Sequence, residues 1–443
     1  MKIVIKSQSI GVLLFFFLFS NQIFAQKKFS LQECIDYALE NSYEIKQRML
    51  EKESKNMQLQ STKTSISPYL GANIGQNFDF GRSTLPDNTN INTTQATTNF
   101  GVGLSMDLFQ GLRTHHQIIS DKLNLEATLF DIESAKESIE LAVTAYYLQI
   151  LLNKEMLEVL NKQVELSQEQ VNRIQILVNN GKSSDADLYA AKSTLANDQL
   201  SVVEAQNTVR LAVLDLAQLM NYSDVNNFDI ENANDSNMDA ILNRDIDINV
   251  VKTTALSSRP TINAALTRIE LVKRNIKIAQ SGWYPSLSFS ASIGSGYFYD
   301  FNAPFNITFR EQFKIFAQES LGLSLRIPIF DKLSTHYAVK QQKISVKSQE
   351  LQLEETKRKL IKDIEQAYTN AVASKEKYFA SQVAYISALV AFQYEEVKYT
   401  AGSSSNYEFN EAKNRYLRAQ SILIQAKFDY LFRVRILEFY GKK

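Results

Sequence analysis

The chain has 443 residues, in which 48 basic residues balance 48 acidic ones. No segment carries the basic stripe that neutralises phosphates, which excludes a nucleic-acid partner. Only 14 Gly and 6 Pro interrupt the sequence. This scarcity disfavours several compact domains and predicts a few very long elements.

Residues 1–26 have the pattern of an export signal. Lys2 and Lys6 form its charged end, residues 10–19 its apolar run, and the end of the segment a cleavage region. The apolar run is too short for a comfortable spanning helix. Cys34 is the only cysteine, and the residues before it lack the small side chains of a lipoprotein site. We therefore expect neither a lipid anchor nor an internal disulfide, and interpret Cys34 as a buried structural thiol.

The first predicted unit has the order helix, strand, strand, helix. Ser30 begins a helix with Glu33 three residues later, the pattern of a capping box, and Pro68 ends the helical region. From Tyr69 the hydrophobic period changes to two, which indicates strands. The segment between the strands is rich in Asn and Thr and is predicted to be a solvated loop. The predicted bounds are 27–220 for the unit, about 69–80 and 99–109 for the strands, and 81–99 for the loop.

A long helix is predicted over residues 112–180. These 69 residues contain no Gly and no Pro, and at about 1.5 Å per residue they would extend roughly 100 Å. Apolar residues recur every seven positions, which indicates helices wound in a left-handed supercoil. Gly181 follows at a predicted tip, residues 179–184, after which a second helix leads back. The repeating residues are Val143, Ile150, Leu157, Val164, Val171 and Val178.

The same unit is predicted to occur twice. Phe109 and Gly181 are 72 positions apart, as are Phe330 and Gly402, which indicates an internal repeat. Between the two units lies an equatorial insertion that is dense in Asn and Asp, with short helical pieces at most. The predicted bounds are 221–249 for the insertion, 250–443 for the second unit, about 286–299 and 320–330 for its strands, 300–319 for the loop between them, 333–400 for its long helix and 400–405 for its tip.

The four strands have one apolar and one polar face, as strands of outer-membrane barrels do. Their polar faces consist of Gly, Ser and Asn, which suit a water-filled lumen, and Trp283-Tyr284 lies where an interfacial aromatic belt would be. A half-buried sheet of a soluble protein would alternate similarly and is the alternative interpretation. Because four strands cannot close and an open edge is not tolerated in lipid, a barrel requires several chains. Three chains would supply twelve strands, and their long helices would form a hollow tube.

This doubled unit, with a Gly at each long-helix turn and an export signal, resembles the TolC family of outer-membrane efflux proteins, the outer membrane factors. The resemblance implies a mostly α-helical fold with a membrane β-barrel: a homotrimer with four strands per chain in a shared 12-stranded barrel and a coiled-coil periplasmic tunnel. It implies a passive duct for small molecules, the exit channel of a tripartite efflux pump. Its partners would be a periplasmic adaptor protein, an inner-membrane RND or ABC transporter, and outer-membrane lipid.

The tips carry the more specific resemblance. In the family a Val precedes the tip Gly, whereas Asn180 and Ala401 stand there in this chain. The family closes its mouth with a Tyr and an Arg of the second tip bonded to an acid of the first. Tyr399 matches the Tyr, but Ser404 stands where the Arg would be, which predicts a differently tied gate. The implied gate residues are Asp187, Tyr399, Glu408 and Glu411, and the implied adaptor-docking residues are Gly181, Lys182, Ser183, Gly402, Ser403 and Ser404.

Other interpretations of these residues stay open. Repeated around a threefold axis, the acids would form a negative collar that attracts cations; alternatively they are solvated acids near helix N-termini. His115 and His336 are repeat mates, yet no carboxylate or Cys completes a metal cluster in sequence. The sequence has no phosphate loop, nucleophile elbow or HExxH motif. We expect no enzyme, no cofactor and no metal.

Two other functions remain compatible with the sequence. A duct of the same shape would serve a type I protein secretion system, which the tube alone does not distinguish from drug efflux. The third possibility is a soluble coiled-coil scaffold in the periplasm. The expected location of the duct is the outer membrane, with the helical portion in the periplasm.

Overall fold

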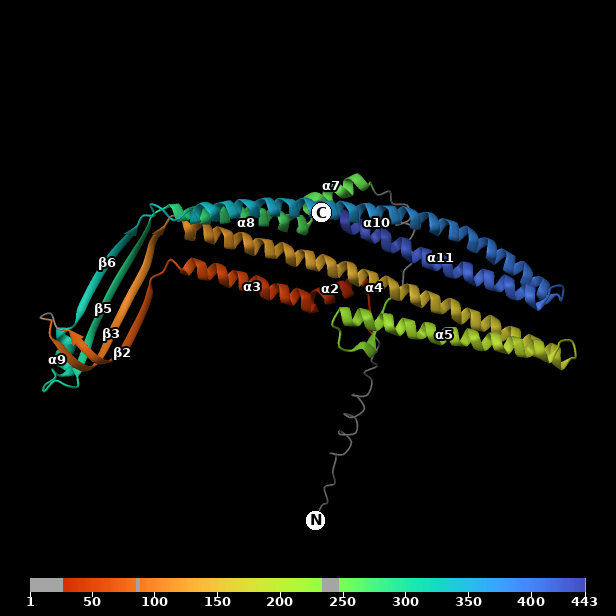
Figure 1. Cartoon of the computed structure of the whole chain (residues 1–443). Coiled ribbons are helices and arrows are strands. Elements are labelled where there is room, and N and C mark those ends of the chain that lie inside the picture. The colour runs from red at the N-terminus through yellow and green to blue at the C-terminus, as the bar shows by residue number, and fades with distance from the viewer. Residues whose placement is uncertain (1–26, 85–87, 233–246, 443) are drawn as a thin grey trace, which may run out of the picture. The chain divides into compact units, whose positions relative to one another are not determined.

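The computed structural model describes residues 27–84, 88–232 and 247–442. The predicted export signal, residues 1–26, lies outside the described residues. The chain divides into two compact units (Figure 1). The hairpin unit comprises Met1–Lys46, Ala135–Ala255 and Ile361–Lys443, and the strand unit comprises Gln47–Ser134 and Leu256–Leu360. The two longest helices contribute residues to both units.

Two helical hairpins dominate the hairpin unit. In each, the end of a long helix lies beside a shorter one, as Figure 1 shows for α4 with α5 and for α10 with α11. The side chains of Val143 and Ile150, on the predicted heptad stripe, are completely buried. The helices are α4 (Arg113–Asn179), α5 (Asp185–Leu219), α10 (Ser334–Thr400) and α11 (Asn406–Gly441), where the sequence predicts long helices over 112–180 and 333–400.

A small two-stranded sheet contains the first residues that the structure describes. β1 (Lys27–Phe29) pairs in parallel with β4 (Phe228–Ile230). The prediction that the insertion 221–249 contains short helical pieces at most was therefore wrong, because β4 is a strand within it. Residues 233–246 of the insertion lie outside the described part. The sheet packs on α2 (Leu31–Asn41), whose Ser30 and Glu33 form the predicted capping box.

Cys34 lies in this core and is completely buried, as predicted. Burial, together with the nearby Glu33 carboxylate, raises the pKa of its thiol to about 12. Because the thiolate is the reactive form, this cysteine is inert.

The strand unit contains one antiparallel sheet in the order β2-β3-β5-β6. Its strands are β2 (Tyr69–Thr84), β3 (Asn90–Gln110), β5 (Ser286–Asp300) and β6 (Gln318–Arg326). The predicted loop 81–99 was wrong, because the β2–β3 ladder continues to the Thr84 and Asn90 pair. Backbone pairing overrides the polar composition there, and Thr is itself a good strand former. β6 ends before Pro328, which has no N–H for a ladder, whereas the sequence predicted a strand to 330.

The strand register puts nearly all the large apolar side chains of the sheet on one side. Val102 of β3 lies between Ala72 of β2 and Ile293 of β5, and Ala291 of β5 pairs with Leu321 of β6. The resulting apolar face contains Leu70, Ile74, Phe78, Phe80, Phe100, Val102, Leu104, Met106, Phe289, Ile293, Tyr297, Leu321 and Leu323. The opposite, polar face contains Gly71, Asn73, Gly75, Asn77, Gly101, Gly103, Ser105, Ser288, Ser290, Ser292, Gly322 and Ser324.

The segment between β5 and β6 is not only a loop. The sequence predicted a loop over 300–319, but residues Phe309–Ile315 form α9. Its start is fixed by a capping box in which Thr308 and Glu311 bond to each other's backbone N–H. Strong local capping therefore produces a helix too short for a periodic pattern to reveal.

Further helices complete each unit. The strand unit has α3 (Tyr43–Thr64), which begins in the hairpin unit, α8 (Pro260–Gln280) and η3 (Ser281–Trp283). The hairpin unit has η1 (Val225–Asn227) and α7 (Ile248–Ser258), which begins before the predicted boundary at 250. In the described part of the chain, no helix is both long and apolar enough to cross a membrane.

The turn from β3 into α4 depends on Gly111. Its φ is +59°, and an added Cβ would lie 2.6 Å from Tyr284 Cβ and 2.8 Å from Ser281 O. We predict that Gly111→Ala destabilises the protein by roughly 1 to 3 kcal/mol, the usual cost of a strained backbone conformation, and lowers the melting temperature measured by circular dichroism. Gly75→Ala is the matched control, because nothing lies within 4 Å of its added Cβ. Equal melting temperatures for the two variants would contradict this role.

Candidate functional site at the hairpin tips

Both hairpins turn with the same backbone geometry. Gly181 and Gly402 have φ values of +65° and +75°. At the first tip Lys182 N donates to Leu177 O at 2.8 Å, and at the second Ser403 N donates to Lys398 O at 2.9 Å. With the shorter-range bonds from Gly181 N and Gly402 N, this is the Schellman motif, which ends a helix on a left-handed residue. The glycines are therefore required by conformation, because nothing lies within 4 Å of an added Cβ at either.

The predicted gate acids Asp187 and Glu408 lie in capping boxes at the start of the returning helices. Asp187 accepts hydrogen bonds from Ser184 N at 3.2 Å, Ser184 Oγ at 2.7 Å and Ser183 Oγ at 3.0 Å. Glu408 accepts from Ser405 N and Ser405 Oγ, both at 2.9 Å. These donors, chiefly the two Ser residues at the N-caps, hold the pKa of both carboxyl groups below their ordinary values. Each acid is thus ionised, exposed and fixed in position.

The remaining predicted tip residues have different surroundings. Glu411 forms an ion pair with Arg415 one turn further along α11. Ser404, which stands where the family's Arg would be, donates to Glu395 and, at 3.2 Å, to Glu408. Lys182 and Ser403 are exposed. At the second tip Glu411 is thus paired with a basic side chain, while Glu408 is held by serine donors.

Tyr399 belongs to an aromatic stack inside the second hairpin. Its ring lies on Phe409 with centroids 4.5 Å apart, Phe409 contacts Phe392, and Phe392 stacks on Tyr416 at 5.3 Å. Burial raises the pKa of the Tyr399 phenol. The first tip is packed differently, with a small aliphatic cluster of Val171, Ile174, Leu188 and Ala191.

Arg173 of α4 ties the first hairpin to the second. Its Nη2 donates to Tyr399 O and Thr400 O, each at 3.0 Å, and its guanidinium lies 4.7 Å from the centre of the Tyr399 ring. A cation here is favoured by the last carbonyl groups of α10 and by the aromatic face. The tie between the tips comes from a residue of the first hairpin, not from the position of Ser404.

A buried polar network connects the hairpins below the tips. The Lys413 side chain is only 1% exposed and donates from Nζ to Ser167 Oγ at 2.9 Å. Ser167 donates in turn to Asp198, which also accepts from Gln163 Nε2 at 2.6 Å. Burial lowers the pKa of Lys413, while the Asp198 charge opposes that shift. Residues of α4, α5 and α11 are joined in this way.

The sequence analysis did not select Arg173, Lys413 or Asp198. A usable signal exists for Lys413, because Phe409, Lys413 and Leu417 are spaced by four and form one buried stripe of α11. A charged residue on an apolar stripe predicts a buried partner. No comparable pattern marks Arg173, whose acceptors are backbone oxygens 226 and 227 positions away.

We predict a strong thermodynamic coupling between Asp198 and Lys413. Asp198→Leu leaves a buried ammonium group without its carboxylate and should cost about 3 to 5 kcal/mol. Adding Lys413→Met should recover much of that loss, since the remaining groups are apolar. The measurement is the apparent melting temperature of each variant in detergent. If the double variant is as unstable as the sum of the two single variants, the two residues are not coupled.

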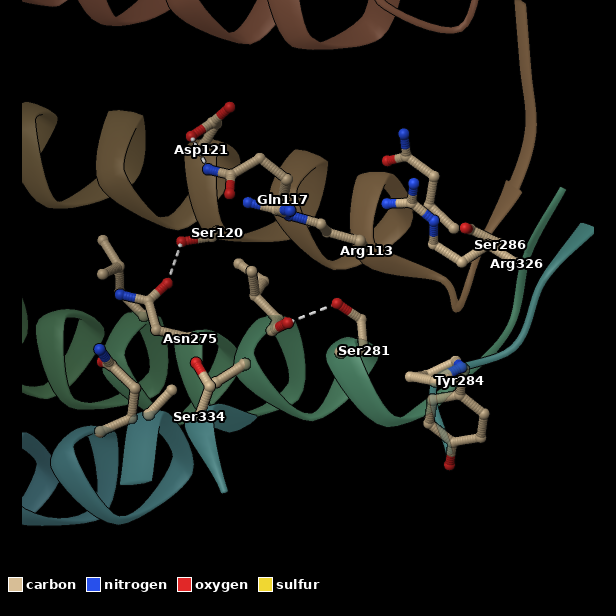
Figure 2. A pocket seen from close by; sticks show the side chains of 18 of the residues that line it. Arg113, Gln117, Ser120, Asp121, Asn275, Ser281, Tyr284, Ser286, Arg326 and Ser334 are labelled. Carbon is tan, nitrogen blue, oxygen red and sulfur yellow. Dashed lines mark hydrogen bonds between the residues drawn. The ribbon is translucent and has the colours of Figure 1, made fainter. Parts of the chain in front are cut away.

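A cavity of about 1000 Å³, lined by both polar and apolar side chains, lies in the strand unit where strands become helices. Figure 2 shows Ser120 bonded to Asn275 and Gln117 bonded to Asp121. Asp121 also accepts a hydrogen bond from Thr62 at 2.6 Å. These bonds hold α3, α4 and α8 side by side at a junction lined by polar groups.

Over the described ranges, no group of three or more His, Cys, Asp or Glu side chains is placed to hold a metal ion. His115 lies beside His116, with ring centroids 5.5 Å apart. What the hairpin tips offer is fixed charge, turn geometry and ties between helices.

Comparisons with known proteins agree with this architecture. Residues 34–222 and 252–438 match the outer membrane efflux protein family. The chain is 21% identical over 416 residues to outer membrane protein TolC of Vibrio cholerae, covering 91% of this chain and 89% of that protein. It is also 21% identical over 307 residues to toxin and drug export protein A of Aggregatibacter actinomycetemcomitans, covering 69% of this chain and 64% of that protein. The CmeC outer membrane channel of Campylobacter jejuni has the same fold, with a TM-score of 0.76, 19% identity, and coverage of 93% of this chain and 85% of CmeC.

The family match, together with the shared fold, defines a channel protein of the outer membrane. The chain belongs to the outer membrane efflux protein family, the TolC-like outer membrane factors. It is an efflux or export channel of the outer membrane with a helical periplasmic portion, and its family is one of ducts rather than enzymes. Membership excludes the soluble periplasmic scaffold.

Proposed function

We propose that three copies of this chain form the outer-membrane exit duct of a tripartite efflux pump. The apolar face of the four-stranded sheet carries this proposal. It contains Ile74 and Leu321, which are 75% and 80% exposed in the single chain. Among the described residues β2 and β6 each pair on one side only, so closure in lipid needs neighbouring copies. Twelve strands from three chains would turn the apolar faces to lipid and the polar faces to water.

The hairpins would then form the periplasmic tunnel and its mouth. Gly181, Lys182 and Ser183 at one tip and Gly402, Ser403 and Ser404 at the other lie at the ends of the hairpins, where a periplasmic adaptor would dock. An inner-membrane RND or ABC transporter would supply the substrate and the energy. We propose the efflux of small molecules as the function, and export of proteins by a type I secretion system as the alternative. The name of one relative, toxin and drug export protein A, covers both.

A negative collar at the mouth would select cations. Asp187 and Glu408 are exposed and held ionised by their caps, while Glu411 is neutralised by Arg415. Threefold repetition of two acids would give six fixed negative charges at the constriction. Tyr399, tied by Arg173, would complete the gate.

We predict that Asp187→Asn combined with Glu408→Gln lowers the cation preference of the channel in planar bilayers. Amide side chains keep the reciprocal capping bonds and remove the charge, so folding is preserved. Because the pKa of each acid lies below its ordinary value, the wild-type preference should be fully present at neutral pH. It should disappear only as the pH falls through the lowered pKa values and the carboxylates become protonated.

Ser405→Ala is the matched control for this experiment. It removes an N-cap hydroxyl and leaves the Glu408 charge, so it should lower stability by about 1 kcal/mol with the cation preference retained. If the amide variant has the same ion selectivity as the wild type, the two acids only cap their helices and do not form a charged collar.

The proposed duct is tested by three linked measurements. Purified protein in detergent should have the mass of a trimer, and it should form conducting pores in planar bilayers. Disruption of the gene should sensitise cells to exported compounds. A conducting trimer from a strain with normal drug resistance but lost protein export would favour secretion, and a detergent-free aqueous monomer would refute the duct.

A further inference from the structure

Residues 301–316, which precede β6, form an aromatic insert on the sheet. α9 lies at its centre, and Figure 1 shows this helix against the end of the sheet that lies away from α4 and α10 within the strand unit. The insert contains Phe301, Phe305, Phe309, Phe313 and Phe316.

The insert packs on the apolar face and not on the polar one. The Phe309 ring lies 5.9 Å from Phe100 and 5.4 Å from Tyr297, and the Phe313 ring lies 6.0 Å from Phe100. Phe100 and Tyr297 belong to the apolar face by the strand register. Any surface that covers this face must therefore also meet the insert.

Gln312 fixes the insert to the sheet. Its side chain is 3% exposed; its Oε1 accepts from Phe298 N at 2.8 Å and its Nε2 donates to Phe298 O at 2.7 Å. Ser295 Oγ donates to Phe313 O at 2.6 Å. The β5–β6 ladder ends at the Gly294 and Gln318 pair, so the amide of Gln312 replaces the missing strand at the edge of β5. The helix is thus an integral part of the sheet and not a loose loop.

The outer side of the insert remains apolar and uncovered within the chain. Phe305 is 79% exposed, Ile315 64% and Phe316 50%. Arg310 and Lys314, one turn apart on α9, are both exposed as well. The nearest acid on the helix, Glu311, is engaged at the N-cap, where Thr308 Oγ1 donates to it at 2.7 Å.

We propose that the aromatic insert is an interfacial membrane anchor, which lies in the lipid headgroup region with its rings towards the acyl chains and Arg310 and Lys314 bound to anionic phosphates. Exposed aromatic and aliphatic side chains beside exposed basic residues suit that depth. Continuity with the apolar face favours lipid over a protein partner. The inference rests on the proposed orientation of the sheet, with its apolar face towards lipid.

Tryptophan fluorescence tests the anchor. Trp283 is the only tryptophan, so Ile315→Trp in a Trp283→Phe chain gives a single probe in the trimer, reconstituted into vesicles of phosphatidylcholine and phosphatidylglycerol. We expect brominated lipid to reduce its emission at least twofold and acrylamide to have little effect. Leu323→Trp reports separately on the apolar face, and Tyr407→Trp, at a tip residue that is 76% exposed, should respond to acrylamide alone.

The outcomes separate the anchor from the duct. If Leu323→Trp is quenched by lipid while Ile315→Trp responds to acrylamide, the anchor is refuted and the orientation of the sheet stands. If both respond only to acrylamide, both proposals fail. If Ile315→Trp is shielded from both quenchers, a second copy of the chain covers the insert and the lipid anchor is again refuted.

The basic pair has its own test. Brominated phosphatidylglycerol should quench Ile315→Trp more than brominated phosphatidylcholine does, and Arg310→Gln with Lys314→Gln should remove that difference. A difference that survives both substitutions would refute phosphate binding by the pair.

Discussion

The structure depends on one constraint, that a backbone N–H or C=O group cannot stay unpaired in lipid. Within the chain β3 and β5 are paired on both sides, whereas β2 and β6 are edge strands. A soluble protein would protect such edges with charge, proline or a covering segment. In this sheet the Gln312 side chain protects one stretch of the β5 edge by bonding to the backbone N–H and C=O of Phe298. Among the described residues the edges of β2 and β6 have no such protection, and the proposed duct would pair them with neighbouring copies in the membrane.

In the hairpin unit, the relative register of the four long helices must be fixed. Helices with similar apolar faces can pack in several registers. A uniform heptad seam does not distinguish one register from the next. The buried Lys413, Ser167 and Asp198 network does, because displacing α11 by one turn would leave an unpaired charge in an apolar layer. Arg173 supplies a second fixed point at the tips. Such polar layers contribute little net stability and favour one arrangement over its neighbours.

The elements most visible in the sequence are those whose side-chain period is long and whose ends carry recognised signals. The Gly- and Pro-free stretches coincide closely with α4 and α10, and Ser30 with Glu33 marks the start of α2. Predictions from the sequence fail where backbone pairing or a residue far away in the sequence determines the local structure. Pairing with β2 draws residues 90–98 into β3 despite their polar composition, and β4 forms because residues 27–29 are available as its partner. At the tips, the internal repeat locates Gly181 and Gly402, and the family resemblance points to Asp187 and Glu408. Arg173 bonds to backbone acceptors that no sequence pattern specifies.

The charge selection that we propose for the tips is compatible with the capping bonds of the same carboxylates. A capping box satisfies backbone donors that the Schellman turn leaves at the start of the returning helix, and the same bonds stabilise the ionised form and restrain the side chain. An unrestrained surface acid would lose part of its effect through motion and through screening by salt, which acts over about 8 Å at physiological ionic strength. A carboxylate held by Ser184 or Ser405 keeps its charge at one place on the rim. Both tips combine a glycine in the left-handed conformation, a serine N-cap and an acid six positions after the glycine. In the proposed duct, the turn that ends each hairpin would therefore also determine where charge lies at the mouth.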